Sequence, residues 1–179
     1  MLTNHVLQVE KWPSNPVDLI IDALAEYPPN AQVADFGCGD AAVAQSPRLS
    51  CAVHSFDLVA KNEFVTAADM AAVPLPAGGC TAAVFCLALM GTNYIEFVAE
   101  AHRVLKPGGL MHMAEVRSRI EDLPAFERGI SSVGFRKKSR DMSNTMFVLY
   151  EFERQGGPPV RDRKRLTAPP LQACAYKRR

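Results

Sequence analysis

The 179-residue chain lacks an apolar run approaching the roughly 18 residues that a membrane-spanning helix needs, and its start lacks the pattern of a secretory signal peptide. Its five cysteines include no C-x₂₋₄-C pair, the spacing typical of structural zinc sites. Their odd number and irregular spacing also argue against a disulfide framework. We therefore expect a soluble protein of a reducing compartment, with no bound metal and no membrane partner.

Charge is distributed unevenly along the chain. Residues 1–153 carry 12 Lys and Arg against 18 Asp and Glu, whereas residues 154–179 carry 8 basic residues and one acid, Asp162. The length is sufficient for one domain with a sizeable core. We expect that domain over residues 1–153, followed by a basic tail over 154–179. Such a tail is typical of nucleic-acid contact or nuclear import, or else it only aids solubility.

Predicted strands and helices alternate along most of the chain. A helix is expected to begin near Pro16 and to end before Pro28-Pro29, and two more are expected at 94–105 and 123–133. Strands are expected at 33–36, 52–56, 64–67, 82–89, 110–116 and 145–152, with 136–140 as a solvated strand edge. This alternation predicts an α/β, Rossmann-like fold with a mostly parallel sheet and helices on both faces.

A glycine-rich loop follows the first expected strand. Gly37 and Gly39, with Ala42 in the last place, match G-x-G-x-x-A, a pattern that opens a helix and lets backbone approach a ligand. Asp57 comes 20 residues after Gly37, where an acid that binds ribose hydroxyls is expected. The pattern alone fits NAD, S-adenosylmethionine, or a tight turn without a ligand.

Three further features favour S-adenosylmethionine. Asp35 precedes the glycines, where a carboxylate suits an ammonium and a sulfonium group but repels a pyrophosphate. Asp69-Met70 follows the third strand, where an acid and an apolar side chain suit an adenine ring. Residues 103–109 are typical of the helix-to-strand turn of methyltransferases, and no Tyr-x-x-x-Lys pair supports hydride transfer.

Several longer segments resemble the ribosomal RNA-processing protein 8 (nucleomethylin) family. The similarity runs from about Gln8 to Arg179. The matching segments are ADFGCGD at 34–40, SFDL at 55–58, Asp69-Met70, VFCLALMGTN at 84–93, RVLKPGG at 103–109, Glu115-Val116, Ser118-Arg119, 141–144 and LQACAYKRR at 171–179.

The resemblance implies an S-adenosylmethionine-dependent methyltransferase that modifies N1 of an adenine in large-subunit ribosomal RNA, in the nucleus and nucleolus. It places cofactor contacts at Gly37, Asp57, Asp69, Met70 and Cys86, to which the loop pattern adds Asp35 and Gly39. It also implies a role in silencing ribosomal DNA with chromatin-silencing proteins. The alternative is therefore a cofactor-binding silencing module that transfers no methyl group.

The N-terminal segment departs from the family pattern. The family has a Tyr-His pair upstream of a Q-V-x-K-W-P segment, and its histidine contacts the cofactor. Here Gln8 begins that segment, but His5 stands about three residues out of register, so the role is not transferred to it. We expect the domain to be truncated, or alternatively started, at its N-terminal end.

The methyl-accepting site and the tail complete the expectations. Asn93, Glu115 and Arg117 are the candidates for holding the adenine, although the catalytic residues are not assigned. In the tail, a basic cluster is expected to lie on a loop that reaches RNA phosphates, with apolar residues beyond it docked on the domain. The cluster is Arg161, Arg163, Lys164 and Arg165, and the docking residues are Leu171, Cys174 and Tyr176.

Overall fold

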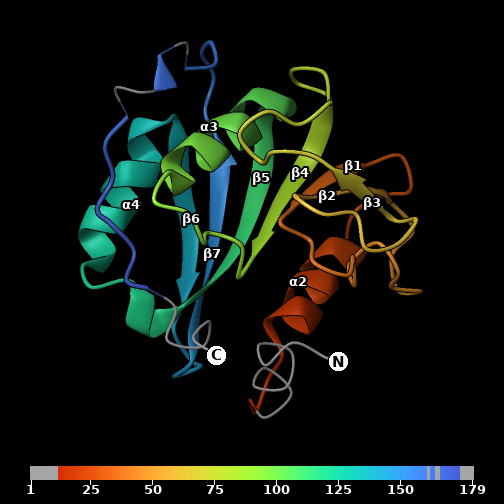
Figure 1. Cartoon of the computed structure of the whole chain (residues 1–179), viewed down its shortest axis with the longest axis horizontal. Helices are drawn as coiled ribbons and strands as arrows, with labels where there is room; N and C mark the ends of the chain where they lie inside the picture. Colours follow the sequence, from red (N-terminus) through yellow and green to blue (C-terminus); the bar gives the residue numbers. More distant parts are fainter. Residues whose placement is uncertain (1–11, 161, 164–165, 174–179) are drawn as a thin grey trace.

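A computed structural model describes residues 12–160, 162–163 and 166–173 of the chain. These residues form a seven-stranded sheet with helices on both of its faces, which confirms the expected fold class (Figure 1). In chain order the elements are α2 (Pro16–Ala25), β1 (Gln32–Phe36), β2 (Ala52–Asp57), β3 (Val65–Ala67), β4 (Cys80–Cys86), α3 (Tyr94–Val104), β5 (Leu105–Val116), η1 (Arg117–Arg119), α4 (Leu123–Ser132), β6 (Phe135–Asp141) and β7 (Phe147–Arg154).

The strands lie in the order β3-β2-β1-β4-β5-β7-β6. Strands β1 to β5 are parallel, and β7 runs antiparallel between β5 and β6. The order reverses between β1 and β4, since the chain leads from β1 to β2 on one side and from β4 to β5 on the other. Ligands of open α/β sheets bind at such a reversal point.

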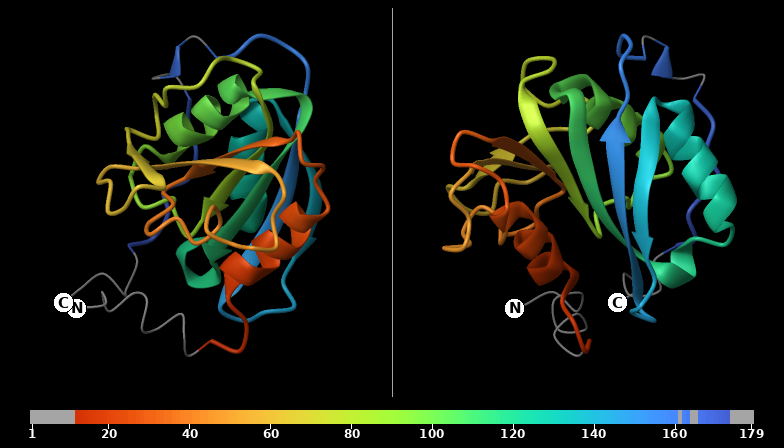
Figure 2. Two further views of the ribbon diagram at one scale, coloured as in Figure 1. Left: turned by 90° about the vertical axis from the view of Figure 1, so that its right-hand side faces the viewer. Right: turned by 180° about the vertical axis from the view of Figure 1, so that it is seen from behind.

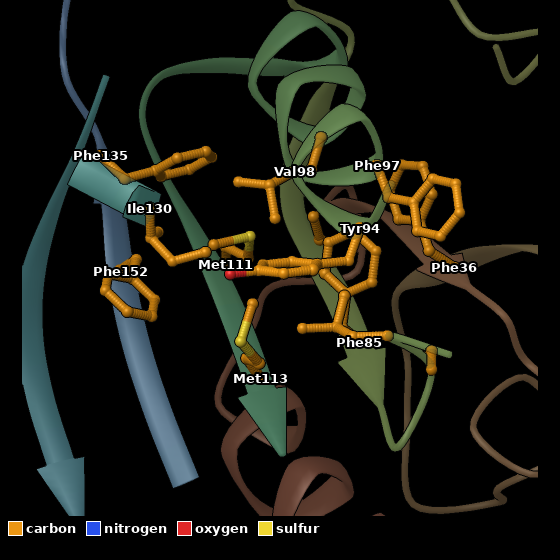
Figure 3. Packing of buried hydrophobic residues seen from close by; sticks show 14 of the residues in the cluster. Phe36, Phe85, Tyr94, Phe97, Val98, Met111, Met113, Ile130, Phe135 and Phe152 are labelled. Atoms are coloured by element: carbon orange, nitrogen blue, oxygen red, sulfur yellow. The ribbon is translucent and has the colours of Figure 1, made fainter. Parts of the chain in front are cut away.

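Side chains alternate between the two faces of the sheet. On one face α3 and α4 cover a large apolar core, in which Phe85 of β4 stacks on Phe36 of β1 at a ring-centroid distance of 4.9 Å (Figure 3). On the other face α2 packs against a smaller cluster that includes Val33 and Val84 (Figure 2). Helix α2 begins at Pro16 as expected, because the Asn15 side chain accepts a hydrogen bond from the Val17 amide.

The structure differs from the expected elements in three places. No α-helix directly follows the glycine loop, since residues 39–45 form successive turns. Strand β4 ends at Cys86, before the end of the apolar run, because Leu87 adopts a left-handed φ of 54°. Strand β5 begins at Leu105 and includes the expected Lys-Pro-Gly-Gly turn, where the pairing register with β4 shifts.

The edge strand β6 is basic, as the sequence indicated. Its exposed Lys and Arg side chains pair with Glu127 of α4 on one face of the sheet and with Glu153 of β7 on the other. Exposed charges along an edge strand discourage pairing with a second sheet. No helix in the described part of the chain is both long and apolar enough to cross a membrane.

Candidate functional site

Gly37 lies where the backbone of the glycine loop passes closest to the loop after β4. Its φ is +69°, and a Cβ at this position would lie 2.7 Å from Cβ of Ala88 and 3.1 Å from Sδ of Met70. Only glycine fits both the left-handed backbone and the space. Gly39 also has a left-handed φ of +60°, although a Cβ there would meet open space. The loop therefore presents bare backbone at the carboxyl end of β1.

Asp35 lies directly beneath this loop, near the end of β1. Its side chain is 2% exposed, and its Oδ2 atom has no hydrogen-bond partner among the described residues. Burial, and secondarily the negative charge of Asp57, raises the pKa of Asp35 to about 7. A buried carboxyl group with a free oxygen is costly unless a partner satisfies it. A cation or a hydrogen-bond donor bound above the loop would supply that partner.

Asp57 ends β2 and is joined to the glycine loop. Its Oδ2 accepts a hydrogen bond from the Gly39 amide at 2.9 Å, and its Oδ1 accepts one from the Leu58 amide at 2.8 Å. The Gly37 and Cys38 amides both donate to the Phe56 carbonyl, at 2.8 Å and 3.1 Å. Asp57 thus fixes the shape of the glycine loop, a role that sequence reasoning did not anticipate.

The other expected cofactor residues lie at the same end of the sheet. Asp69 is exposed, and its Oδ1 caps the next turn by accepting from the Ala71 amide at 2.8 Å. The sulfur atom of Met70 fills the space beside Gly37. Cys86 ends β4, and burial, followed by the charges of Asp35 and Glu115, raises the pKa of its thiol, which stays protonated at neutral pH. The structure thus brings the seven expected cofactor residues to the carboxyl ends of β1 to β4.

Two residues at this edge were not singled out from the sequence. Ala88 forms the wall facing Gly37, and Leu58, which follows Asp57, is 72% exposed. An exposed large apolar side chain beside an acid suits an aromatic ring bound there. For Leu58 the signal was its position next to the expected ribose acid. For Ala88 no local signal existed, since it lies in an unbroken apolar run.

The three candidates for holding the target base occupy different environments. Asn93 is exposed and precedes α3. Glu115 is fully buried, with its Oε1 atom 2.9 Å from Nη1 of Arg119, so it is not presented at an open surface. Arg117 is half-buried and donates to the Ile120 carbonyl at 2.7 Å. The structure therefore does not bring the three side chains together in one open pocket.

A cavity of about 350 Å³ opens at the same edge of the sheet, between the start of α2 and the turn that joins β6 to β7. Trp12, which precedes the lining residue Pro13, stacks on Phe147 at a ring-centroid distance of 5.7 Å. Its lining combines apolar and polar residues: Pro13, Ser14, Leu19, Asp141, Ser143, Asn144, Thr145, Phe147 and Leu149. Phe147 pairs with Val116 at the carboxyl end of β5. In the described ranges no group of His, Cys, Asp and Glu is arranged to hold a metal ion.

The expected basic cluster in the tail is only partly described. Arg163 does not extend to solvent as expected. It donates to the Ala71 carbonyl and, at 2.6 Å, to Oε2 of Glu100, which is 1% exposed. Arg161, Lys164 and Arg165 lie outside the described residues, as do Cys174, Tyr176 and residues 1–11. Leu171 packs against the core on the side of α3 and α4.

Comparison with known proteins identifies close sequence relatives. A family model described as "Hypothetical methyltransferase" matches residues 3–179. Ribosomal RNA-processing protein 8 of Rattus norvegicus is 48% identical over 172 residues, which cover 96% of this chain and 37% of the rat protein. The 25S rRNA (adenine(645)-N(1))-methyltransferase of Schizosaccharomyces pombe is 45% identical over 184 residues, covering 96% of this chain and 57% of the yeast protein. The chain thus spans about a third to somewhat over half of the length of these relatives.

Solved structures with the same fold are more distant in sequence. The 1,6-didemethyltoxoflavin-N1-methyltransferase of Burkholderia thailandensis, solved with S-adenosylhomocysteine, is 16% identical with a TM-score of 0.64. That similarity covers 79% of this chain and 77% of the other. The geranyl diphosphate C-methyltransferase of Streptomyces coelicolor is 14% identical with a TM-score of 0.65, covering 77% and 76%. These matches bear out the Rossmann-like sheet, and the sequence relatives bear out the family resemblance.

Proposed function

The chain belongs to the family described as hypothetical methyltransferases, and we propose that it transfers a methyl group from S-adenosylmethionine to N1 of an adenine in large-subunit ribosomal RNA. The observation that carries the cofactor assignment is the left-handed glycine backbone of Gly37 and Gly39 at the end of β1, next to the buried Asp35, whose Oδ2 has no hydrogen-bond partner among the described residues. This arrangement leaves bare backbone for a ligand to approach, and a carboxyl oxygen that needs a cationic partner. The printed name of the yeast relative supports the choice of RNA substrate.

Each of the expected cofactor residues has a role in this proposal. Asp57 would accept hydrogen bonds from the ribose hydroxyls, and Asp35 would face the positively charged methionine end. Asp69 and Met70 would bind the adenine ring, with the exposed side chain of Leu58 against its face. Gly37, Gly39 and Cys86 would contact the cofactor through backbone and packing.

The reaction needs little acid–base catalysis from the protein. S-adenosylmethionine supplies a methyl group on a positively charged sulfur, and N1 of adenine already carries the lone pair that attacks it. The protein therefore has to align the base and exclude water. Asn93, after β4, and Arg117, after β5, lie on loops at this edge and are the accessible candidates for contacting the base. Glu115, being buried, would act on the base only through its charge or through Arg119.

We further propose that the cavity between α2 and the β6–β7 turn receives the RNA. It is large enough for a nucleobase, and its exposed Leu19 offers apolar surface while Asn144 and Thr145 offer hydrogen-bonding groups. The part of β7 that lines the cavity lies two strands from β4, which is about 10 Å at the usual strand spacing. A nucleotide bound there would lie at, or next to, the methylated base.

Filling this cavity tests that assignment. Thr145 lines the cavity and is exposed, so Thr145→Trp should block the cavity without disturbing the core. We expect methylation of RNA to fall by at least about tenfold, because the base loses its alignment, while the dissociation constant for S-adenosylmethionine stays unchanged. The matched control is Ser131→Trp, at an exposed position near the end of α4. Equal activity of the two variants would exclude the cavity.

The raised pKa of Asp35 predicts how stability and cofactor binding depend on pH. Its pKa is raised from 3.8 to about 7, so the folded protein without cofactor holds a proton that the unfolded chain releases. The contribution of Asp35 to the free energy of unfolding should therefore fall as pH rises from about 4 to 7. It is opposed by His102 and His112, whose pKa values burial lowers to about 4 and which therefore add stability as pH rises. A bound cation favours the carboxylate, so the affinity for S-adenosylmethionine should rise between pH 6 and pH 8. Calorimetry and thermal melts at a series of pH values measure both effects.

Asp35→Asn should remove the Asp35 contribution from both pH profiles, because the amide does not titrate. The difference between wild type and the variant then isolates that contribution. Asp18→Asn, which changes an exposed acid on α2, serves as the control and should retain the wild-type slopes. A wild-type affinity for S-adenosylmethionine that does not change between pH 6 and pH 8 would contradict the role of Asp35.

The direct test of the function is methyl transfer. The protein is incubated with labelled S-adenosylmethionine and unmodified large-subunit ribosomal RNA transcripts, and the RNA is digested and analysed for N1-methyladenine by mass spectrometry. We expect label at a single adenine. Binding of the cofactor without transfer to RNA would favour the silencing module, with chromatin-silencing proteins as partners.

Ribosomal RNA processing, which the names of several relatives state, supports a nuclear and nucleolar location for this chain.

A further inference from the structure

Arg119 is a buried cation that joins three separate parts of the chain. It ends η1 and is 4% exposed. Its Nη2 donates to the Leu89 carbonyl at 2.8 Å, and its Nε donates to the Gln172 carbonyl at 2.8 Å. Its Nη1 lies 2.9 Å from Oε1 of the fully buried Glu115. The two carbonyl acceptors and the charge of Glu115 stabilise the buried guanidinium, so all three segments are held to one point. Nη1 of Arg119 and Oε2 of Glu115 make no hydrogen bond among the described residues, so the pair with Glu115 rests on charge.

The Leu89 contact leads to the proposed cofactor site. Leu89 belongs to the loop between β4 and α3, and the preceding residue, Ala88, is the one whose side chain faces Gly37. The loop leaves β4 through the left-handed residue Leu87, whose amide donates to the Ala114 carbonyl at 2.9 Å. Arg119 therefore fixes the carbonyl of Leu89, the residue that follows Ala88. A shift of Leu89 would move Ala88 against Gly37.

The Gln172 contact leads to the C-terminal segment. The Gln172 amide donates in return to the Arg119 carbonyl at 2.9 Å, and the Tyr94 hydroxyl donates to the Pro169 carbonyl at 2.9 Å. Ala168 packs against Gly129 of α4, since a Cβ added at Gly129 would lie 3.0 Å from the Cβ of Ala168. The segment follows the outer side of α4 (Figure 1). Residues 166–173 are thus docked along α3 and α4, with their far end bonded to Arg119.

We infer that Arg119 is a positioning residue that couples the docked C-terminal segment, residues 166–173, to the loop at 87–93 that walls the cofactor site. The inference rests on the proposed cofactor site. Because Arg119 bonds to both segments, ordering one stabilises the other, and binding at the glycine loop is transmitted to residues far from it. Such coupling is reciprocal, and typical couplings change affinity by about 5-fold or more.

Hydrogen exchange and calorimetry test the coupling. On binding S-adenosylmethionine, the wild-type protein should exchange backbone amides more slowly at 87–93 and also at 166–173. Arg119→Lys keeps the charge beside Glu115 but loses the planar set of donors. It should speed exchange at both segments without cofactor and weaken binding at least about 5-fold. The double variant Glu115→Gln with Arg119→Met, which leaves no unpaired buried charge, should show the same pattern if the lysine variant folds poorly.

Thr167→Ala is the matched control. It changes an exposed side chain within the docked segment and leaves the Arg119 contacts and the Tyr94–Pro169 hydrogen bond in place. Its affinity for S-adenosylmethionine should stay within about twofold of wild type, well below the typical coupling range. The inference is overturned if wild type binds cofactor with no change of exchange at 166–173, or if Arg119→Lys binds as wild type does. Should wild type bind no S-adenosylmethionine, the proposed function fails instead. The coupling is then decided by whether Arg119→Lys speeds exchange at 87–93 in the cofactor-free protein.

Discussion

Gly37→Val is expected to abolish S-adenosylmethionine binding. A Cβ at Gly37 would lie 2.7 Å from Cβ of Ala88, a distance that real Cβ atoms essentially never show, and Met70 closes the space on the other side. The two branches of valine would have to project into the remaining space, where the cofactor is proposed to bind. Calorimetric titration with S-adenosylmethionine should give no measurable heat of binding.

The control for this variant is Gly78→Val. Gly78 has the same φ of +69°, but a Cβ there would meet nothing within 4 Å. It therefore reproduces the backbone strain of a left-handed valine, about 1–2 kcal/mol, without the steric block. Gly78→Val should be destabilised yet bind S-adenosylmethionine normally. If Gly37→Val also folds and binds normally, the glycine loop is only a turn and the cofactor assignment fails.

The glycine loop could be predicted because its signal is local. Glycine spacing after a strand, an acid 20 residues later and the family motifs placed Gly37, Asp35 and Asp57 at one edge of the sheet, where the structure has them. The expected helix after the loop did not form. Alanine-rich residues 41–44 favour a helix, but Pro47 follows within a turn, and so short a segment does not nucleate one on its own.

The end of β4 could not be predicted for a different reason. Residues 82–89 form one apolar run, and all of them are at least partly buried, the last three in a loop packed beneath α3. Hydrophobic periodicity reports burial, and it cannot distinguish a strand from a buried loop. Leu87 turns the chain with a positive φ, which is uncommon for a leucine and carries no sequence signal.

Long-range ion pairs were the least accessible to sequence reasoning. Arg163 was expected to contact RNA because basic residues surround it, yet its partner is Glu100, 63 positions earlier. Arg119 and Glu115 are four residues apart, a spacing typical of a surface helix, but here they form a buried pair at the end of β5. Which charged side chain is buried depends on the tertiary arrangement of the tail. The number of basic residues in the tail therefore overstates how much positive charge is free to bind RNA.

Asp57→Ala is expected to weaken S-adenosylmethionine binding by more than about tenfold. Loss of a charged acceptor for ribose hydroxyls costs about 1.5–3 kcal/mol, which corresponds to a factor of roughly 10 to 150. The structure adds a second cause, since Asp57 also accepts the Gly39 amide at 2.9 Å and so holds the glycine loop in place. Both causes act in the same direction, which makes this the largest effect expected from a change that introduces no steric clash.

Asp57→Asn separates the two causes. Its amide oxygen can still accept a hydrogen bond from Gly39 or Leu58, but the negative charge is lost, so the loop should keep its shape while the ribose contact weakens. If the ribose contact dominates, Asp57→Asn should bind nearly as poorly as Asp57→Ala. If loop shape dominates, Asp57→Asn should bind close to wild type, and hydrogen exchange at the Gly39 amide should rise only in Asp57→Ala. An unchanged dissociation constant in a folded Asp57→Ala protein would refute the assignment of this acid to the cofactor.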